Sequence, residues 1–205
     1  MKVLGISTSP RENSNSDILL KQVLSGASSA GAEAEYLRLN KFNLAPCRSC
    51  EGCYSTGTCI IEDDFQSLLP KIVQAERLIF ASPVYFMNVC AQAKIFIDRC
   101  ECLWASKYLL KRHINEGGEK RLGMVIATGA TKGKTLFDGI RLTMKYFFDA
   151  IDTRYYANLF VSRIEQPGMV SENKEAMDEA YLLGAKLAND QGETMEKIIE
   201  YEYPE

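Results

Sequence analysis

Short apolar runs alternate with longer amphipathic segments along most of this 205-residue chain, and that alternation limits the fold more than any other feature. Apolar runs of this length, bounded by small or polar residues, are typical of strands buried in a sheet. The predicted strands are Lys2–Ile6, Ala34–Leu39, Arg77–Ala81, Arg121–Ala127 and Tyr155–Val161. Apolar residues at helical spacing predict helices over Asp17–Ala30, Phe65–Ala75, Ala91–Trp104, Thr135–Ala150 and Ser171–Asp190. Asp63 and Asp64 are expected to cap the second of these helices.

Strands that alternate with helices pair in parallel, with the helices packed on both faces of the sheet. Five strands in this order suit an α/β fold, the flavodoxin-like doubly wound five-stranded parallel sheet with helices on both faces. The length suits a single domain, which we place at residues 1–190 with a cysteine-rich insertion at 45–62. Residues 191–205 hold five glutamates and one lysine, and they are expected to form an acidic C-terminal tail.

The composition excludes several classes of protein. A formal net charge of −3, from 24 basic and 27 acidic residues, gives no electrostatic reason to expect a nucleic-acid partner. No apolar run approaches the ~20 residues that span a bilayer, so we expect no membrane partner. The first residues lack the apolar segment of a secretory signal, which makes the cytoplasm the expected compartment.

The loop after the first strand predicts a phosphate site. Residues 7–16 (STSPRENSNS) carry five hydroxyls, two amides and a guanidinium, and they lead directly into a helix. The N-terminus of a helix presents free N–H groups and a partial positive charge, which together with such side chains bind phosphate. The loop matches neither the GxGxxG nor the GxxxxGK[ST] pattern. The alternative is a polar loop that only caps the helix.

Two further loops follow strands and are expected at the same edge, because ligands of open parallel sheets bind outside the carboxyl ends of the strands. Residues 82–91 (SPVYFMNVCA) offer aromatic faces and an amide, as a flat heteroaromatic ring requires. Residues 128–134 (TGATKGK) contain two glycines that allow close backbone approach. The alternatives are aromatic side chains that join the core and a solvated third loop.

Four of the seven cysteines fall within thirteen residues, at Cys47, Cys50, Cys53 and Cys59. An odd number of cysteines and no export signal argue against a disulfide framework. The C-x2-C-x2-C-x5-C spacing could surround one iron–sulfur cluster. Zinc, which usually takes its cysteines in two separated pairs, and thiols that bind no metal remain the alternatives. The other three, Cys90, Cys100 and Cys102, are expected to be small core residues.

The segments GISTSPRENSNS, SPVYFMNVCAQAKIFIDR and ATGATKGK resemble the NADPH-dependent FMN reductase superfamily, over roughly residues 1–165. The added segment CRSCEGCYSTGTCIIEDD is similar to the iron–sulfur flavoprotein branch of that superfamily. The resemblance implies that the first loop holds the FMN phosphate through Ser7, Ser9, Arg11, Ser14, Asn15 and Ser16. It places the flavin ring along Pro83, Val84, Tyr85, Phe86, Met87 and Asn88, with Thr128 and Gly129 beside it. It implies that Cys47, Cys50, Cys53 and Cys59 bind a [4Fe–4S] cluster.

By this resemblance the protein is an FMN-dependent oxidoreductase that passes electrons between the [4Fe–4S] cluster and FMN and reduces a small-molecule acceptor. Its donor is expected to be a ferredoxin-like carrier or NAD(P)H as co-substrate. No catalytic side chain is required, because the cofactors carry the chemistry. The alternative is a cluster-free NAD(P)H-dependent FMN or quinone oxidoreductase. The resemblance also implies a homodimer or homotetramer.

Overall fold

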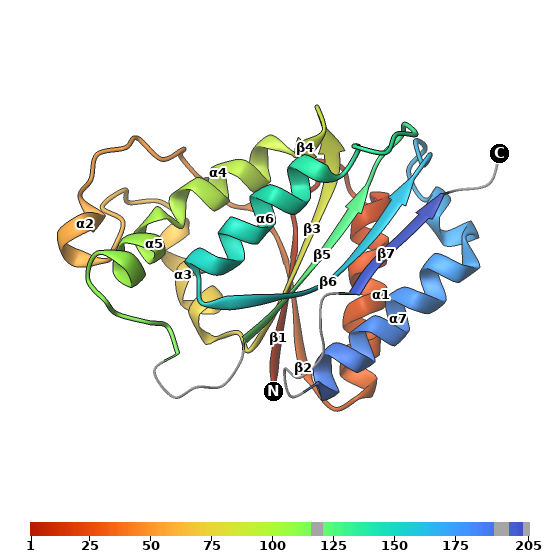
Figure 1. Ribbon diagram of the computed structural model, residues 1–205, viewed down its shortest axis with the longest axis horizontal. Helices are drawn as coiled ribbons and strands as arrows, with labels where there is room; N and C mark the ends of the chain where they lie inside the picture. The colour runs from red at the N-terminus through yellow and green to blue at the C-terminus, as the bar shows by residue number, and fades with distance from the viewer. Residues whose placement is uncertain (116–120, 191–196, 203–205) are drawn as a thin grey trace.

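A twisted parallel sheet runs through the centre of the molecule, and helices cover both of its faces (Figure 1). The computed structural model describes residues 1–115, 121–190 and 197–202. The strands pair in parallel in the order β2-β1-β3-β5-β6-β7. Their bounds are β1 (Lys2–Ser7), β2 (Glu33–Arg38), β3 (Arg77–Tyr85), β5 (Arg121–Thr128), β6 (Thr153–Ser162) and β7 (Lys197–Glu202).

The predicted doubly wound sheet is confirmed, because the five expected strands are all present in the order of a flavodoxin-like fold. Two strands are additional. The short β4 (Asn88–Val89) pairs antiparallel with the end of β3. The other, β7, lies within the segment expected as an acidic tail and extends the sheet beyond β6. The rest of that segment, residues 191–196 and 203–205, lies outside the described residues.

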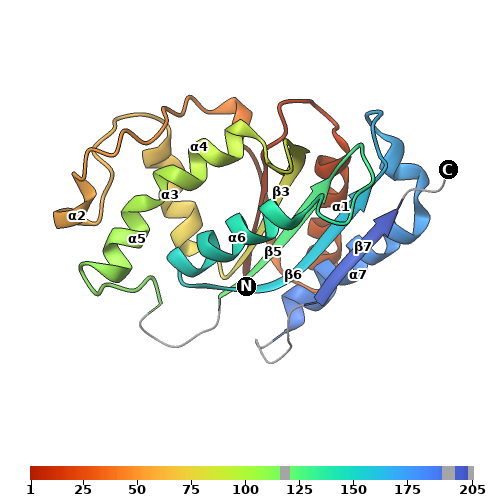
Figure 2. The same cartoon turned by 45° about the horizontal axis from the view of Figure 1, so that its top comes forward.

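The helices divide between the two faces of the sheet (Figures 1 and 2). On one face lie α1 (Asn15–Ser29) and α7 (Lys174–Asn189). On the other lie α3 (Phe65–Gln74), α4 (Ala91–Arg99), α5 (Glu101–Tyr108) and α6 (Asp138–Ala150). The remaining short elements are α2 (Cys53–Thr56), η1 (Leu39–Lys41) and η2 (Met169–Glu172). No helix among the described residues has the length and apolarity to cross a membrane.

Two glycines let α1 and α7 pack closely. A Cβ at Gly26 would lie 1.9 Å from the carbonyl oxygen of Tyr181, and a Cβ at Gly184 would lie 1.9 Å from that of Val23. Each helix backbone therefore rests directly on the other. This contact fixes α1, whose first turn borders the phosphate loop.

The helix predicted over Ala91–Trp104 is wrong as a single element. It is two helices, α4 and α5, that meet at Cys100. The backbone N–H of Cys100 still bonds to the carbonyls of Phe96 and Ile97, so α4 closes there before α5 begins. The break turns the chain at Arg99, whose side chain is buried.

Arg121, the first residue of β5, ties two helices to the amino edge of the sheet. Its Nε donates to the carbonyl of Ala75 at 2.9 Å and its Nη1 to that of Ile151 at 2.6 Å, while Nη2 donates to that of Ile72. A cation at the ends of α3 and α6 satisfies their free carbonyls. The loops that form the sites lie at the opposite, carboxyl edge of the sheet.

Candidate functional site

A pocket of about 220 Å³ lies at the carboxyl ends of β1, β3 and β5. The three predicted loops all reach it. Its walls include eight of the residues expected to contact the cofactor: Ser9, Arg11, Ser14, Asn15, Pro83, Val84, Tyr85 and Thr128. The structure therefore brings together side chains that are more than a hundred residues apart in the sequence.

The first loop shapes one end of this pocket around the start of α1. Ser14 is the N-cap, with extended backbone (φ −66°, ψ 160°), and its Oγ accepts from the N–H of Asp17 at 3.3 Å. The Oγ atoms of Ser14 and Ser16 are 3.3 Å apart, and the N–H of Arg11 donates to Ser9 Oγ at 3.2 Å. A helix N-terminus, hydroxyls and an arginine together fit an anion such as phosphate.

Ser7 lies deeper, at the end of β1, where its side chain is completely buried. Within the described part of the chain its Oγ has no hydrogen-bond partner. A buried hydroxyl without a partner is costly, so this donor is available for an anion seated on the loop.

The side chain of Asn15 has a different use from the expected one. Its Nδ2 donates to the carbonyl of Gln166 at 2.9 Å, and its Oδ1 accepts from the N–H of Val170 at 3.2 Å. The amide thus ties the start of α1 to the loop after β6. That loop adds Ile164, Glu165 and Pro167 to the pocket wall, and we missed it in the sequence. The signal was present, because the loop follows another parallel strand at the same edge.

The second loop is a two-residue hairpin turn between β3 and β4, in which Tyr85 pairs with Asn88. Both turn residues have positive φ, 48° at Phe86 and 59° at Met87. For residues other than glycine this conformation costs roughly 1–2 kcal/mol each. The ring of Phe86 is fully exposed and the side chain of Met87 is half-exposed. Strained backbone that displays apolar side chains beside a pocket is typical of a ligand contact.

Neighbouring elements hold this turn in place. A Cβ at Gly139, in the first turn of α6, would lie 2.4 Å from the carbonyl oxygen of Met87. The Oδ1 of Asn88 accepts from its neighbour Val89 N at 2.8 Å and from Thr143 Oγ1 of α6 at 3.1 Å. In the third loop, Gly129 N donates to the carbonyl of Val161 at 2.9 Å. The turn is thus supported by α6, and the third loop by β6.

A second pocket, of about 360 Å³, is lined by all four clustered cysteines. Cys53 begins α2, which ends at Gly57 in a left-handed conformation (φ 78°), and the chain then returns to Cys59. Cys50 is exposed and the other three are partly buried. Among residues 1–115, 121–190 and 197–202, no three His, Cys, Asp or Glu side chains are grouped as a site for a single metal ion.

A fifth cysteine, Cys102, is buried in the core as predicted and also lines the same pocket. Burial raises the pKa of its thiol to about 12, and the nearby thiols of Cys59 and Cys53 add to the shift. Cys102 comes from α5, which lies beside α2 (Figure 1). The break between α4 and α5 brings it to the pocket.

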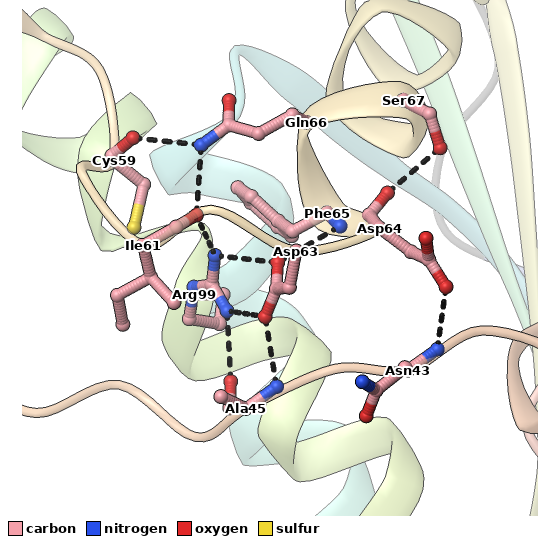
Figure 3. Close-up of polar contacts among 10 residues, drawn as sticks. All are labelled: Asn43, Ala45, Cys59, Ile61, Asp63, Asp64, Phe65, Gln66, Ser67 and Arg99. Atoms are coloured by element: carbon pink, nitrogen blue, oxygen red, sulfur yellow. Dashed lines mark hydrogen bonds and ion pairs between the residues drawn. The ribbon is translucent and has the colours of Figure 1, made fainter.

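Arg99 and Asp63 form an ion pair at the base of the cysteine segment (Figure 3). Burial opposes the charge on Asp63, but hydrogen bonds from Arg99, Ala45 N and Phe65 N outweigh it and hold the pKa of this carboxyl below its usual value. The bond from Phe65 N agrees with the predicted cap. Asp64 occupies the N-cap position, but its side chain makes no cap bond and instead accepts from Asn43 N at 2.7 Å.

One helix leads from the hairpin to the cysteine pocket. The hairpin turn is followed by β4 and Cys90, and α4 then starts at Ala91 and ends at Arg99 in the wall of the cysteine pocket. Nine helical residues span about 13 Å. The chain therefore connects the hairpin turn to the cysteine pocket through β4 and one short helix.

A family model described as NADPH-dependent FMN reductase matches residues 1–159. An iron-sulfur flavoprotein of Methanocaldococcus jannaschii is 31% identical over 196 residues, which are 92% of this chain and 96% of that protein. An iron-sulfur flavoprotein of Methanosarcina thermophila is 33% identical over 114 residues, 56% of this chain and 60% of that protein. Among solved structures, the NAD(P)H:quinone oxidoreductase from Methanothermobacter marburgensis has a TM-score of 0.70 and 20% identity, over 91% of this chain and 96% of that chain. At that identity the likeness is one of fold.

Proposed function

The chain belongs to the NADPH-dependent FMN reductase family and is a flavin-dependent oxidoreductase, and we propose that it passes electrons between a [4Fe–4S] cluster and FMN. The observation that carries the proposal is the presence of two pockets in one chain, with β4 and α4 leading from the hairpin beside the first to the wall of the second. One has the donors of a phosphate site and the other has the thiols of the four clustered cysteines. When bound, the cluster exchanges single electrons and FMN exchanges one or two.

The first pocket supports the position of FMN. Its size suits the phosphate and the adjoining chain better than the whole cofactor, because sites that enclose a ligand of that size have volumes of about 300–1,000 Å³. The phosphate would be held by Arg11, the Ser14 region and the first amides of α1. The ring would lie outward along Tyr85 and the hairpin turn, where exposed apolar side chains offer it a face.

The cysteine pocket supports a cluster through the chemistry of its donor set. Its four clustered cysteines supply thiolates, the ligands that iron–sulfur clusters use. The positive charge of Arg99 lies in the same wall and would balance part of the negative charge that four thiolates bring.

The partners follow from the same chemistry. A one-electron donor such as a ferredoxin-like carrier would deliver electrons to the cysteine end of the chain. NAD(P)H would deliver electrons in pairs to the exposed flavin edge, and a small oxidant such as a quinone would collect them there.

Metal and flavin analysis of anaerobically purified protein tests the proposal. We expect one FMN, about four iron and about four acid-labile sulfide per chain. Iron and sulfide near zero, with FMN bound and NAD(P)H oxidised, would replace the proposal with a cluster-free FMN or quinone oxidoreductase. Stoichiometric zinc would likewise overturn it.

Two variants test whether the sites are separate. Cys53→Ser should lose iron and keep FMN, and Arg11→Gln should weaken FMN binding and keep iron. The FMN of Cys53→Ser should no longer be reduced by reduced ferredoxin but should still be reduced by NAD(P)H. Cys100→Ala is the matched control, because this buried cysteine does not line the pocket. Full iron content in Cys53→Ser would contradict the assignment of the ligands.

A further inference from the structure

The two ends of the cysteine segment are joined by one buried arginine (Figure 3). The side chain of Arg99 is completely buried at the end of α4. Its Nη1 donates to the carbonyl of Ala45 at 2.8 Å, and its Nη2 to the carbonyl of Ile61 at 3.3 Å. Ala45 precedes the first clustered cysteine and Ile61 follows the last. The guanidinium therefore bridges the start and the end of the segment.

Asp63 completes the same junction. Its Oδ2 accepts from Arg99 Nη1 at 2.6 Å and from Ala45 N at 2.8 Å, and its Oδ1 accepts from Arg99 Nη2 at 3.0 Å. This is the two-bonded geometry that arginine makes with a carboxylate and that lysine cannot reproduce. Gln66 adds bonds to the carbonyls of Cys59 and Ile61.

The guanidinium retains one donor on the cysteine side. Arg99 Nε is buried without a hydrogen-bond partner among the described residues, and Arg99 shares the wall of the cysteine pocket with Cys59. The ring of Phe65 lies 4.6 Å from the guanidinium carbon and packs against the cation. A buried cationic N–H without an acceptor is unfavourable, whereas a thiolate in the pocket would be an acceptor.

We propose that Arg99 is a positioning residue for the cysteine segment: its bonds to Asp63, Ala45 and Ile61 hold the two ends of the segment together, and its charge and free Nε–H stabilise thiolates in the pocket. The second half of this inference rests on the proposed function. Hydrogen bonds and positive charge near ligand sulfurs favour the reduced state of an iron–sulfur cluster. Arg99 would thus set both the geometry and the midpoint potential of the site.

Two substitutions separate these effects. Arg99→Lys keeps the charge and loses the two-bonded geometry, and Arg99→Gln loses both. Arg77→Gln is the matched control, because Arg77 is also buried but donates to the carbonyls of Leu187 and Asp190 at the end of α7.

The first measurement is hydrogen exchange of residues 45–62 in the FMN-loaded protein from which iron has been removed. We expect faster exchange there in both Arg99 variants and unchanged exchange there in Arg77→Gln. Exchange at the wild-type rate in both Arg99 variants would overturn the positioning role. This measurement does not depend on a cluster, so it stands if the wild-type protein proves to bind no iron.

The second measurement is the midpoint potential of the cluster. We expect Arg99→Gln to shift it to a lower value, while Arg99→Lys stays near the wild-type protein. An unchanged potential in Arg99→Gln would overturn the electrostatic role. If Arg99→Gln binds no iron but keeps FMN, its loss of iron supports the positioning role. The midpoint potential is then compared between Arg99→Lys and the wild-type protein, and a clear difference between these two would overturn the electrostatic role.

Discussion

Replacement of Gly139 by alanine tests whether α6 holds the flavin-side turn in place. A Cβ at this position would lie 2.4 Å from the carbonyl oxygen of Met87, whereas non-bonded heavy atoms prefer separations near about 3.5 Å. The turn or the helix must therefore move by about 1 Å. Helix propensity alone favours alanine over glycine by about 1 kcal/mol, and overpacking of this kind costs about 1–3 kcal/mol. The two effects have opposite signs, so the experiment decides between them.

We expect the overlap to dominate and Gly139→Ala to lower the free energy of unfolding by about 1 kcal/mol. The displaced turn includes the side chains of residues 85–87. The dissociation constant of FMN should therefore rise about tenfold, which corresponds to about 1.4 kcal/mol. Titration of FMN fluorescence with apoprotein measures the affinity, and urea unfolding measures the stability. The matched control is Lys145→Ala, an exposed position on the same helix. Wild-type affinity in Gly139→Ala would refute the idea that α6 shapes the flavin contact.

Three further predictions concern stability. Gly184→Ala should lower the free energy of unfolding by about 2 kcal/mol, because its Cβ would lie 1.9 Å from Val23 O. The control Ser25→Ala, at an exposed position on α1, should change this free energy by less than about 0.5 kcal/mol. A Gly184→Ala protein more stable than the wild type would contradict the close helix contact. Arg121→Met should cost about 3 kcal/mol, since the carbonyls of Ala75 and Ile72 lose their donor and that of Ile151 keeps only Thr153 Oγ1. An unchanged urea midpoint would show that water or other donors replace Arg121. A hydrogen bond from Tyr108 holds the pKa of Asp149 below its usual value, and bonds from Ile114 N, His113 and Lys107 outweigh burial to do the same for Asp152. Both side chains are therefore more acidic in the folded protein, so the stability they contribute is complete above the unfolded pKa of about 3.9 and is lost as the pH falls through the lower folded pKa values. The double variant Asp149→Asn with Asp152→Asn should show a smaller acid-induced fall in Tm. A fall identical to that of the wild type would disprove the role of these two carboxylates.

The strands β1, β3, β5 and β6 were predictable because they are largely buried and so appear as apolar runs. Arg121–Ala127 shows this most clearly, since every residue of β5 is buried. The shared pocket followed from topology, because parallel strands present their carboxyl ends at one edge. Side chains such as Arg11 and Tyr85 were therefore placed together without knowledge of any contact.

The break at Cys100 could not be predicted from local sequence. Residues 97–104 contain neither glycine nor proline, the residues that break a helix most strongly. Arg99, the last residue of α4, pairs with Asp63, 36 residues earlier. The side chain of Asn15 likewise bonds to a residue distant in sequence, because its partner Gln166 lies 151 residues away. No periodicity reveals such contacts, so neither the place of Cys102 in the pocket wall nor the partners of the Asn15 amide could be predicted.

The outermost strand has a practical consequence for producing this protein. Composition alone would recommend trimming the glutamate-rich end after residue 190, but β7 pairs with β6 from Ala157–Lys197 to Ser162–Glu202. Three of the six residues of β7 are charged, as is common where a sheet must not recruit another chain. A shortened product would expose the apolar border of β6 in its place, and we expect it to precipitate on expression. Affinity tags on the C-terminal side should therefore follow residue 205 and never replace this segment.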